Sequence, residues 1–89
     1  EYTLANIRWA LQVEPENIAL QQRWEAASQL RSEGAPTLPS TIEAELDTNP
    51  FLRTAQATVS NAASRYAGAT LNDPVSIFAS LREWKNNFR

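Results

Sequence analysis

The sequence predicts a small all-α domain built from five helices. Apolar residues recur three and four positions apart through most of the chain, which is the spacing of one helix face. Capping residues, two glycines and five prolines divide the chain into five such segments. No stretch alternates apolar and polar residues with the β-branched enrichment of a strand. Because 89 residues suffice for one domain and not for two, we expect a single helical domain over residues 1–89.

The first predicted helix covers residues 2–13, with Thr3 as its candidate N-cap and Pro15 just beyond its end. It carries two stripes at helical spacing on nearly opposite sides. One stripe is Leu4, Ile7 and Leu11, and the other is Tyr2, Asn6, Trp9 and Val13. A helix with two such faces is usually packed between layers. Two interpretations stay open: either a second domain covers the Trp9 face, or this domain wraps the helix completely.

Capping signals place the second and third helices. Asn17 is a candidate N-cap for a helix that runs up to Gly34, where a glycine commonly ends a helix. Residues 35–39 contain two prolines and form an extended connector. The Ser-Thr-Ile-Glu run at 40–43 has the spacing of a capping box. It opens a short third helix that ends before the Asn-Pro pair at 49–50.

A glycine and an Asp-Pro pair define the fourth and fifth helices. The fourth covers about residues 55–67 and ends at Gly68, and the fifth begins at Asp73-Pro74 and runs to about residue 88. Each has a single apolar stripe. The stripes are Val59, Ala62, Ala63 and Tyr66 in the fourth, and Ile77, Leu81, Trp84 and Phe88 in the fifth. The small residues of the fourth stripe indicate close contact between helices.

The chain contains no histidine and no cysteine. This composition excludes a thiol nucleophile, a Ser-His triad, a disulfide framework and a His/Cys zinc site. We therefore predict no catalytic residue and no metal ligand in this chain. The absence of cysteine is consistent with a cytoplasmic protein, and no apolar run is long enough to span a membrane. The acidic N-terminus lacks the apolar segment of a signal peptide. Because the chain contains no methionine, we expect a piece of a longer protein.

Charge gives the most specific binding candidates. The net charge of −2 does not favour a nucleic-acid partner, but the fifth helix carries Arg82, Lys85 and Arg89 in one row beside its apolar stripe. Such a row can bind a carboxylate, since arginine offers a fork of N–H donors and lysine a point charge. The alternative is that these cations only complement the negative end of the helix dipole.

The other polar residues are weaker candidates. Tyr2 and Asn6, one turn apart, either bind a ligand or are ordinary residues of a helix start. Arg53 reaches either a helix C-terminus or a domain partner. The acids near helix ends are expected to be structural rather than catalytic; they are Glu14, Glu16, Glu43, Glu45 and Asp47.

Five stretches carry a resemblance to a known family. They are Glu1-Tyr2-Thr3 with Asn6, Val13-Glu14-Pro15, Gly34 to Ile42, Asn49 to Arg53, and Leu81 to Phe88. In order and spacing they resemble the C-terminal domain of hydroxyacylglutathione hydrolases, also called glyoxalase II. The proline-serine connector followed by Asn-Pro-Phe-Leu-Arg is the most specific part, and the match covers essentially the whole chain.

The resemblance implies a parent enzyme whose N-terminal metallo-β-lactamase-like domain holds two metal ions, zinc or iron and manganese, and the activated hydroxide. That parent would hydrolyse S-D-lactoylglutathione to glutathione and D-lactate, a step of methylglyoxal detoxification. The helical domain would bind the glutathione half of the substrate through Tyr2, Arg82 and Lys85. The family pattern also implies a metal-binding histidine directly before Glu1, and it places the two-faced first helix between the domains.

Two positions depart from the family pattern: Trp9 replaces a frequent phenylalanine, and Asn86 replaces a frequent aspartate. An alternative function from another class is a non-catalytic helical protein-interaction module, whose first helix docks a partner. The residue encoded just before Glu1 separates the two hypotheses. A histidine there favours the enzyme, and a start codon or a linker favours the module.

Overall fold

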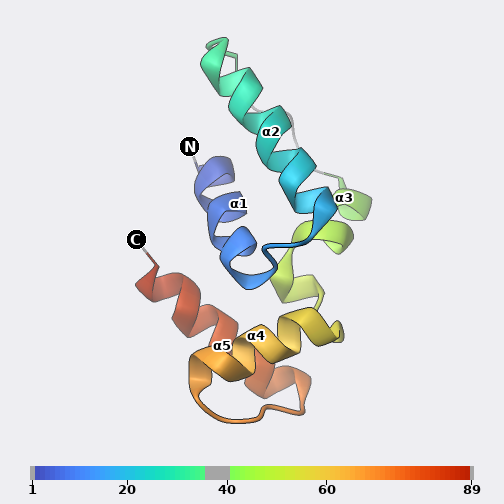
Figure 1. Cartoon of the computed structure of the whole chain (residues 1–89), viewed down its shortest axis with the longest axis vertical. Helices are drawn as coiled ribbons and strands as arrows, with labels where there is room; N and C mark the ends of the chain where they lie inside the picture. Colours follow the sequence, from blue (N-terminus) through green and yellow to red (C-terminus); the bar gives the residue numbers. More distant parts are fainter. Residues whose placement is uncertain (1, 36–40, 89) are drawn as a thin grey trace.

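The structure of the chain, a computed structural model, describes residues 2–35 and 41–88. The described part contains helices and no strand (Figure 1). In chain order the elements are α1 (Tyr2–Val13), α2 (Ile18–Ser32), α3 (Ile42–Thr48), the 3-10 helix η1 (Pro50–Leu52), α4 (Ala57–Ala67) and α5 (Pro74–Asn87). The predicted all-α class and its five helices are confirmed.

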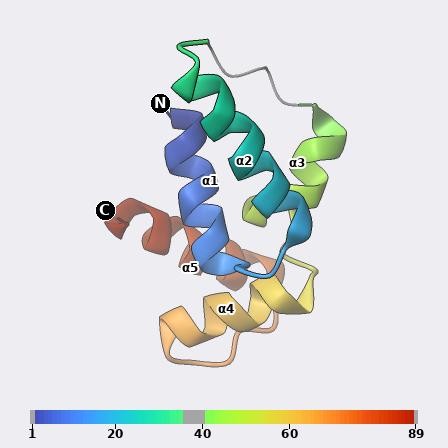
Figure 2. The ribbon, with the colours of Figure 1, turned by 45° about the horizontal axis from the view of Figure 1, so that its top comes forward.

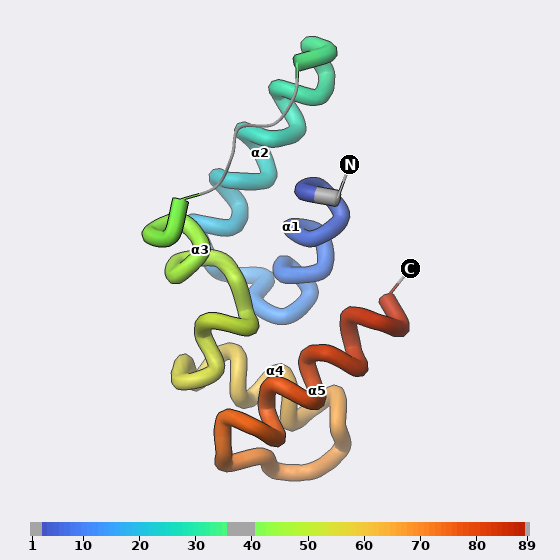
Figure 3. The backbone as a smooth tube through the Cα atoms, turned by 180° about the vertical axis from the view of Figure 1, so that it is seen from behind, coloured from blue at the N-terminus to red at the C-terminus, as the bar shows by residue number. Residues whose placement is uncertain are grey.

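The helices pack mainly as two pairs. Helix α1 lies side by side with α2, and α4 packs across α5 (Figures 1 and 2). Helix α3 and η1 connect the two pairs, since α3 contacts α2 and η1 contacts α5. The last turns of α5 extend toward α1, as Figure 3 shows from behind. This approach brings the C-terminal part of the chain beside its first helix.

Local chemistry fixes most helix ends where the sequence predicted them. The N-caps Asn17, Thr41 and Asp73 each accept a hydrogen bond from the backbone N–H three residues later, at 3.2, 3.0 and 2.9 Å. Gly34 and Gly68 follow α2 and α4 in the left-handed conformation, with φ of 74° and 73°. Side-chain caps therefore set the starts of α2, α3 and α5, and glycines set the ends of α2 and α4.

Three predicted details of the helix ends are wrong. Thr3 is no N-cap, because α1 begins at Tyr2 and includes it. Thr41 rather than Ser40 caps α3, and Glu43 is therefore exposed in the first turn instead of closing a capping box. Ser40 lies outside the described residues. Helix α4 begins at Ala57, later than the predicted residue 55.

The buried core draws on α1, α2, α4 and α5. Its members are Ile7, Trp9, Ala10, Val13, Leu20, Ala27, Val59, Ala62, Ala63, Ile77 and Leu81. The small stripe of α4 lets α5 approach closely, and Ser80 Oγ donates to the Ala63 carbonyl at 2.8 Å across that contact. Among the described residues, no helix combines the length and hydropathy that a membrane span requires.

The second stripe of α1 is buried inside this domain. Trp9 is 2% exposed and Val13 1%, so the interpretation that leaves a Trp9 face open to a second domain is wrong, and the domain wraps the helix at these positions. The Trp9 ring stacks on Phe51 at 5.3 Å between centroids and meets Trp84 edge-on at 6.2 Å. These rings reach α1 from η1 and α5, which supply the cover that periodicity alone cannot reveal.

Candidate functional site

A pocket of about 440 Å³ lies where α1, α2, α3, η1 and the end of α5 meet. Its volume falls in the range typical of small-molecule sites. The apolar lining includes Ile7, Trp9, Leu20 and Phe51, and the polar lining includes Thr3, Asn6, Arg23, Glu45, Thr48 and Lys85. A wall that combines apolar side chains with polar groups can hold a ligand and fix its orientation.

Lys85 is the one predicted cation that lines this pocket among the described residues. It is half-buried on the last turn of α5, and Asn6 lines the same pocket from α1. Arg82 is exposed one turn earlier and lies outside the lining. Tyr2 begins α1 one turn before Asn6, and its side chain, like Arg89, lies outside the described part of the structure.

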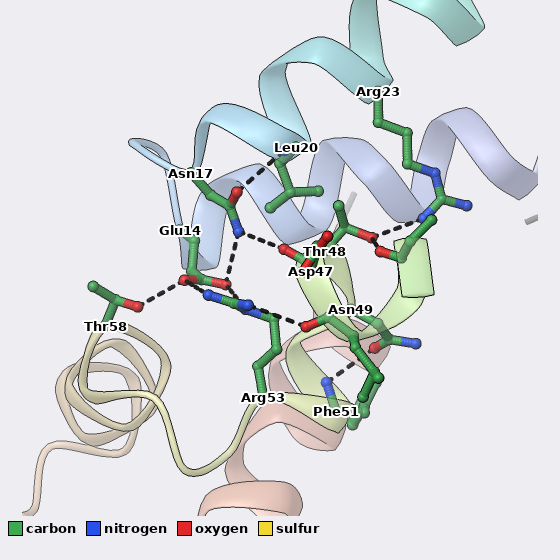
Figure 4. Close-up of polar contacts among 12 residues, drawn as sticks. Glu14, Asn17, Leu20, Arg23, Asp47, Thr48, Asn49, Phe51, Arg53 and Thr58 are labelled. Atoms are coloured by element: carbon green, nitrogen blue, oxygen red, sulfur yellow. Dashed lines mark hydrogen bonds and ion pairs between the residues drawn. The ribbon is translucent and has the colours of Figure 1, made fainter. Parts of the chain in front are cut away.

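The wall opposite the start of α1 is held by a polar link between α2 and α3. Arg23 Nη1 donates to Thr48 Oγ1 at 2.8 Å (Figure 4). The same nitrogen forms an ion pair with the Glu45 carboxylate at 3.1 Å. Thr48 is buried and donates in turn to the Ala44 carbonyl at 2.6 Å. The charge of Arg23 is thus balanced within the domain. Among the described residues, Lys85 is the cation of the lining that forms no ion pair with a carboxylate.

Sequence reasoning missed a second polar cluster, centred on Glu14. Its side chain is 4% exposed and lies in the turn between α1 and α2. The carboxylate accepts hydrogen bonds from Arg53 Nε at 2.8 Å and Nη2 at 3.1 Å, and from Thr58 Oγ1 at 2.7 Å (Figure 4). Asn17 Nδ2 donates to it at 3.3 Å. This cluster joins the α1–α2 turn, η1 and the start of α4.

The electrostatics of the Glu14 cluster are those of a stable ion pair. Burial raises the pKa of Glu14, but hydrogen bonds from Arg53 and Thr58, with the Arg53 charge, outweigh it and hold the pKa below its usual value. The same hydrogen bond raises the pKa of Arg53. A charged carboxylate with every oxygen bonded is a structural group, so Glu14 is no candidate general acid or base at neutral pH.

Arg53 contacts a helix C-terminus, which is one of its two predicted alternatives. Besides binding Glu14, its Nη1 donates to the Leu46 carbonyl in the last turn of α3 at 3.1 Å. Arg53 therefore reaches a helix C-terminus. The Asn-Pro pair at the start of η1 helps to place Arg53, since Asn49 Oδ1 accepts from Phe51 N at 2.9 Å and turns the chain.

The other acidic residues near helix ends do not form a cluster. Glu16, Glu43 and Asp47 are exposed, and Glu45 pairs with Arg23. Within residues 2–35 and 41–88, no three His, Cys, Asp or Glu side chains are grouped so that they could hold a metal ion. The described residues thus provide a pocket and a structural ion pair.

Comparison with known proteins decides the family. The family model described as "Hydroxyacylglutathione hydrolase C-terminus" matches residues 1–88. This chain belongs to that family. It is 52% identical over its whole length to a hydroxyacylglutathione hydrolase of Nitrosomonas europaea, and it covers 34% of that relative. Hydroxyacylglutathione hydrolases of Xylella fastidiosa strain M12 and Pseudomonas paraeruginosa are 52% and 50% identical over 99% of the chain, each again covered to 34%.

The chain therefore spans about a third of the length of the hydroxyacylglutathione hydrolases it matches. The predicted family is confirmed, and the comparisons favour a hydrolase parent over a free-standing interaction module. About two thirds of each relative lies outside the matched region, which leaves room for a separate domain.

Proposed function

We propose that this chain is the glutathione-binding part of a hydroxyacylglutathione hydrolase, whose parent hydrolyses S-D-lactoylglutathione to glutathione and D-lactate. In this proposal the chain binds and orients the tripeptide half of the substrate, and its partner is the N-terminal portion of its own parent. We place the parent in the cytoplasm, as the absence of cysteine suggests.

One observation carries the proposal: Lys85 lines a pocket of about 440 Å³ together with Asn6 and apolar side chains. Glutathione is a tripeptide with two carboxylates, and a half-buried ammonium is a suitable partner for one of them. Apolar side chains such as Ile7 and Phe51 line the same pocket, and a less polar surrounding strengthens a contact between charges. The pocket volume suits a ligand of this size.

Arg82 and Tyr2 are the other two members of the proposed site. Arg82 is exposed one turn before Lys85, where its guanidinium fork can meet the same carboxylate at the entrance. Tyr2 starts α1, one turn before Asn6. In this arrangement Lys85 acts from inside the pocket, and Arg82 acts at its edge.

The proposal assigns the bond-breaking step to residues outside this chain. Two metal ions, proposed for the parent, would supply activated hydroxide against the thioester carbonyl. The described residues do not fit such a centre, because they group no metal ligands. The contribution of this chain is substrate positioning, and we expect the purified 89-residue chain to hydrolyse no thioester.

The test compares two thioesters in the full-length parent. One is S-D-lactoylglutathione, and the other is the D-lactoyl thioester of N-acetylcysteamine, which has no carboxylate. We expect Lys85→Ala to reduce the preference for the glutathione thioester, measured as the ratio of kcat/KM values, by roughly tenfold or more. The matched control is Arg31→Ala on the far end of α2, which should leave that ratio unchanged. An unchanged preference in Lys85→Ala would refute the proposed role.

A further inference from the structure

We infer that Arg8 is a positioning residue for Lys85 and acts through the ring of Phe88. The Arg8 Cζ atom lies 5.3 Å from the centroid of the Phe88 ring, within the range of a cation–π contact. Arg8 belongs to α1, and Phe88 directly follows the last residue of α5. The contact therefore ties the end of α5 to the first helix. The inference rests on the proposed function, since it concerns the same site.

The backbone links Phe88 directly to Lys85. The N–H of Phe88 donates to the Lys85 carbonyl at 3.2 Å, which closes the final turn of α5. The last turn of a helix lacks further backbone partners and frays easily unless something holds it. Fixing the Phe88 ring thus keeps the turn that carries Lys85 in its helical form.

Two ring contacts hold α5 in place one turn before Phe88. One turn before Phe88, the Trp84 ring meets the buried Trp9 edge-on at 6.2 Å. Trp84 also stacks on Tyr66 of α4, with centroids 5.0 Å apart and an interplanar angle of 7°. Helix α5 is therefore anchored at Trp84 by two rings. Beyond that point, the contact of Phe88 with Arg8 continues the attachment to α1.

Arg8 is placed to act on Lys85 rather than on the substrate. Its side chain is exposed, and it lies outside the lining of the pocket that contains Lys85 and Asn6. If the last turn frays, only the fraction of molecules with Lys85 in place binds the carboxylate well, and the apparent affinity falls by that fraction. The loss is bounded by the strength of an exposed cation–π contact, which corresponds to roughly two- to fivefold.

The experiment is steady-state kinetics on the full-length parent with S-D-lactoylglutathione. We expect Arg8→Met, which keeps the apolar stem, and Phe88→Leu, which removes the ring, each to raise KM by roughly two- to fivefold with kcat unchanged. Phe88 also packs against the core, and Phe88→Leu removes the ring on which Arg8 acts. The double variant should therefore show no larger rise than Phe88→Leu alone. Arg8→Lys, which keeps a cation, should recover part of the loss. Arg31→Met is the control for removing an exposed arginine charge.

The decisive arm places Arg8→Met in the Lys85→Ala background, where it should no longer change KM. A further rise there would show that Arg8 acts on the substrate by its own charge and would overturn the inference. An unchanged KM in Phe88→Leu alone would also overturn it, because the ring would then not be the link to Lys85. An unchanged KM in Arg8→Met, together with a raised KM in Lys85→Ala, would overturn the inference about Arg8 and leave the proposed function standing. If Lys85→Ala itself leaves KM unchanged, the proposed function fails, and this inference fails with it.

Discussion

Glu14 and Arg53 form a two-pronged ion pair across 39 positions of the sequence, with N···O distances of 2.8 and 3.1 Å. The pair joins the turn after α1 to the segment after η1, and Thr58 extends it to α4. Side-chain exposures of 4% for Glu14 and 18% for Arg53 place it out of most solvent. Elements that are far apart in the chain are thereby held in one arrangement around the pocket.

The first prediction concerns the stability that depends on this pair. Glu14→Ala leaves the Arg53 guanidinium half-enclosed without its carboxylate, so we expect the free energy of unfolding to fall by about 2–3 kcal/mol. Urea unfolding of the 89-residue chain, followed by tryptophan fluorescence, measures this loss. Glu25→Ala on the exposed side of α2 is the matched control and should change stability by less than about 0.5 kcal/mol.

Adding Arg53→Met to Glu14→Ala should recover part of the loss, because the second change removes the unpaired charge. Arg53→Met alone should destabilise strongly, since it leaves the Glu14 carboxylate buried. Losses in the two single variants that simply add in the double variant would contradict the interpretation that the pair acts as a unit.

The second prediction is a pH dependence. The pKa of Glu14 lies below its ordinary value of 4.5 in the folded chain, because hydrogen bonds from Arg53 and Thr58 outweigh the effect of burial. A carboxyl group with a lowered folded pKa stabilises fully above its unfolded pKa, and this stabilisation is lost as pH falls through the folded pKa. We therefore expect the Glu14 contribution to be constant above about pH 5 and to decline at lower pH.

Urea midpoints of the wild type and Glu14→Gln, measured from neutral to acidic pH, isolate that contribution. The difference between the two proteins should shrink as the solution becomes acidic. The pKa of Asp73 is also lowered, by its hydrogen bonds with Ser76, but Asp73 is present in both proteins and cancels in the difference. Parallel curves over the whole range would show that Glu14 does not titrate with unfolding.

The third prediction concerns Trp9. Because the ring is 2% exposed and packed between Phe51 and Trp84, we expect Trp9→Gln to cost at least about 3 kcal/mol of stability. Far-UV circular dichroism in urea measures the change without relying on the removed fluorophore. Trp9→Phe should cost less, since it keeps a ring and removes the buried Nε1–H that has no acceptor among the described residues. Better solubility of Trp9→Gln with little stability lost would instead indicate an exposed ring.

The fourth prediction tests the end of α4. Gly68 has φ of 73°, and a Cβ built on it meets no atom within 4 Å. Gly68→Ala should therefore destabilise by about 1 kcal/mol through the left-handed backbone alone, without a steric clash. Gly68→Asn, which tolerates this conformation better, should recover part of the loss. Equal stability of the wild type and Gly68→Ala, judged by thermal melting, would contradict the assignment of Gly68 as a conformational helix end.

Local signals explain why the helices could be predicted. Asn17, Asp73 and Gly68 act on backbone groups within four residues, so the sequence around each is sufficient to place a helix end. The cover over Trp9 could not be predicted in this way. It comes from Phe51 and Trp84, which are distant in the chain, and the spacing of α1 alone allowed a second domain equally well.

The candidate site was likewise predictable only where its residues lie close together in the sequence. The row containing Arg82 and Lys85 was visible in the sequence, because both lie on one helix at i and i+3. That Lys85 lines a pocket with Asn6 depends on how α5 meets α1, which no local pattern encodes. Glu14 was placed at a helix break and expected to be structural. Its burial was missed because its partners Arg53 and Thr58 lie 39 and 44 positions away.

The last prediction ranks the two proposed carboxylate-binding cations. If both hold the substrate equally in the ground and transition states, removing either raises KM and leaves kcat nearly constant. Lys85 is half-buried in the pocket lining and Arg82 is exposed, so solvent screens the arginine contact more, although its fork is more directional. We therefore expect Lys85→Ala to raise KM for S-D-lactoylglutathione by on the order of tenfold or more, and Arg82→Ala by less.

Steady-state kinetics of the full-length parent at low and high salt measure both KM changes, and the Arg82 effect should weaken more as salt rises. Melting temperatures taken alongside should barely move, since neither side chain belongs to the buried core. A larger KM effect for Arg82→Ala would place the carboxylate at the entrance of the pocket rather than inside it.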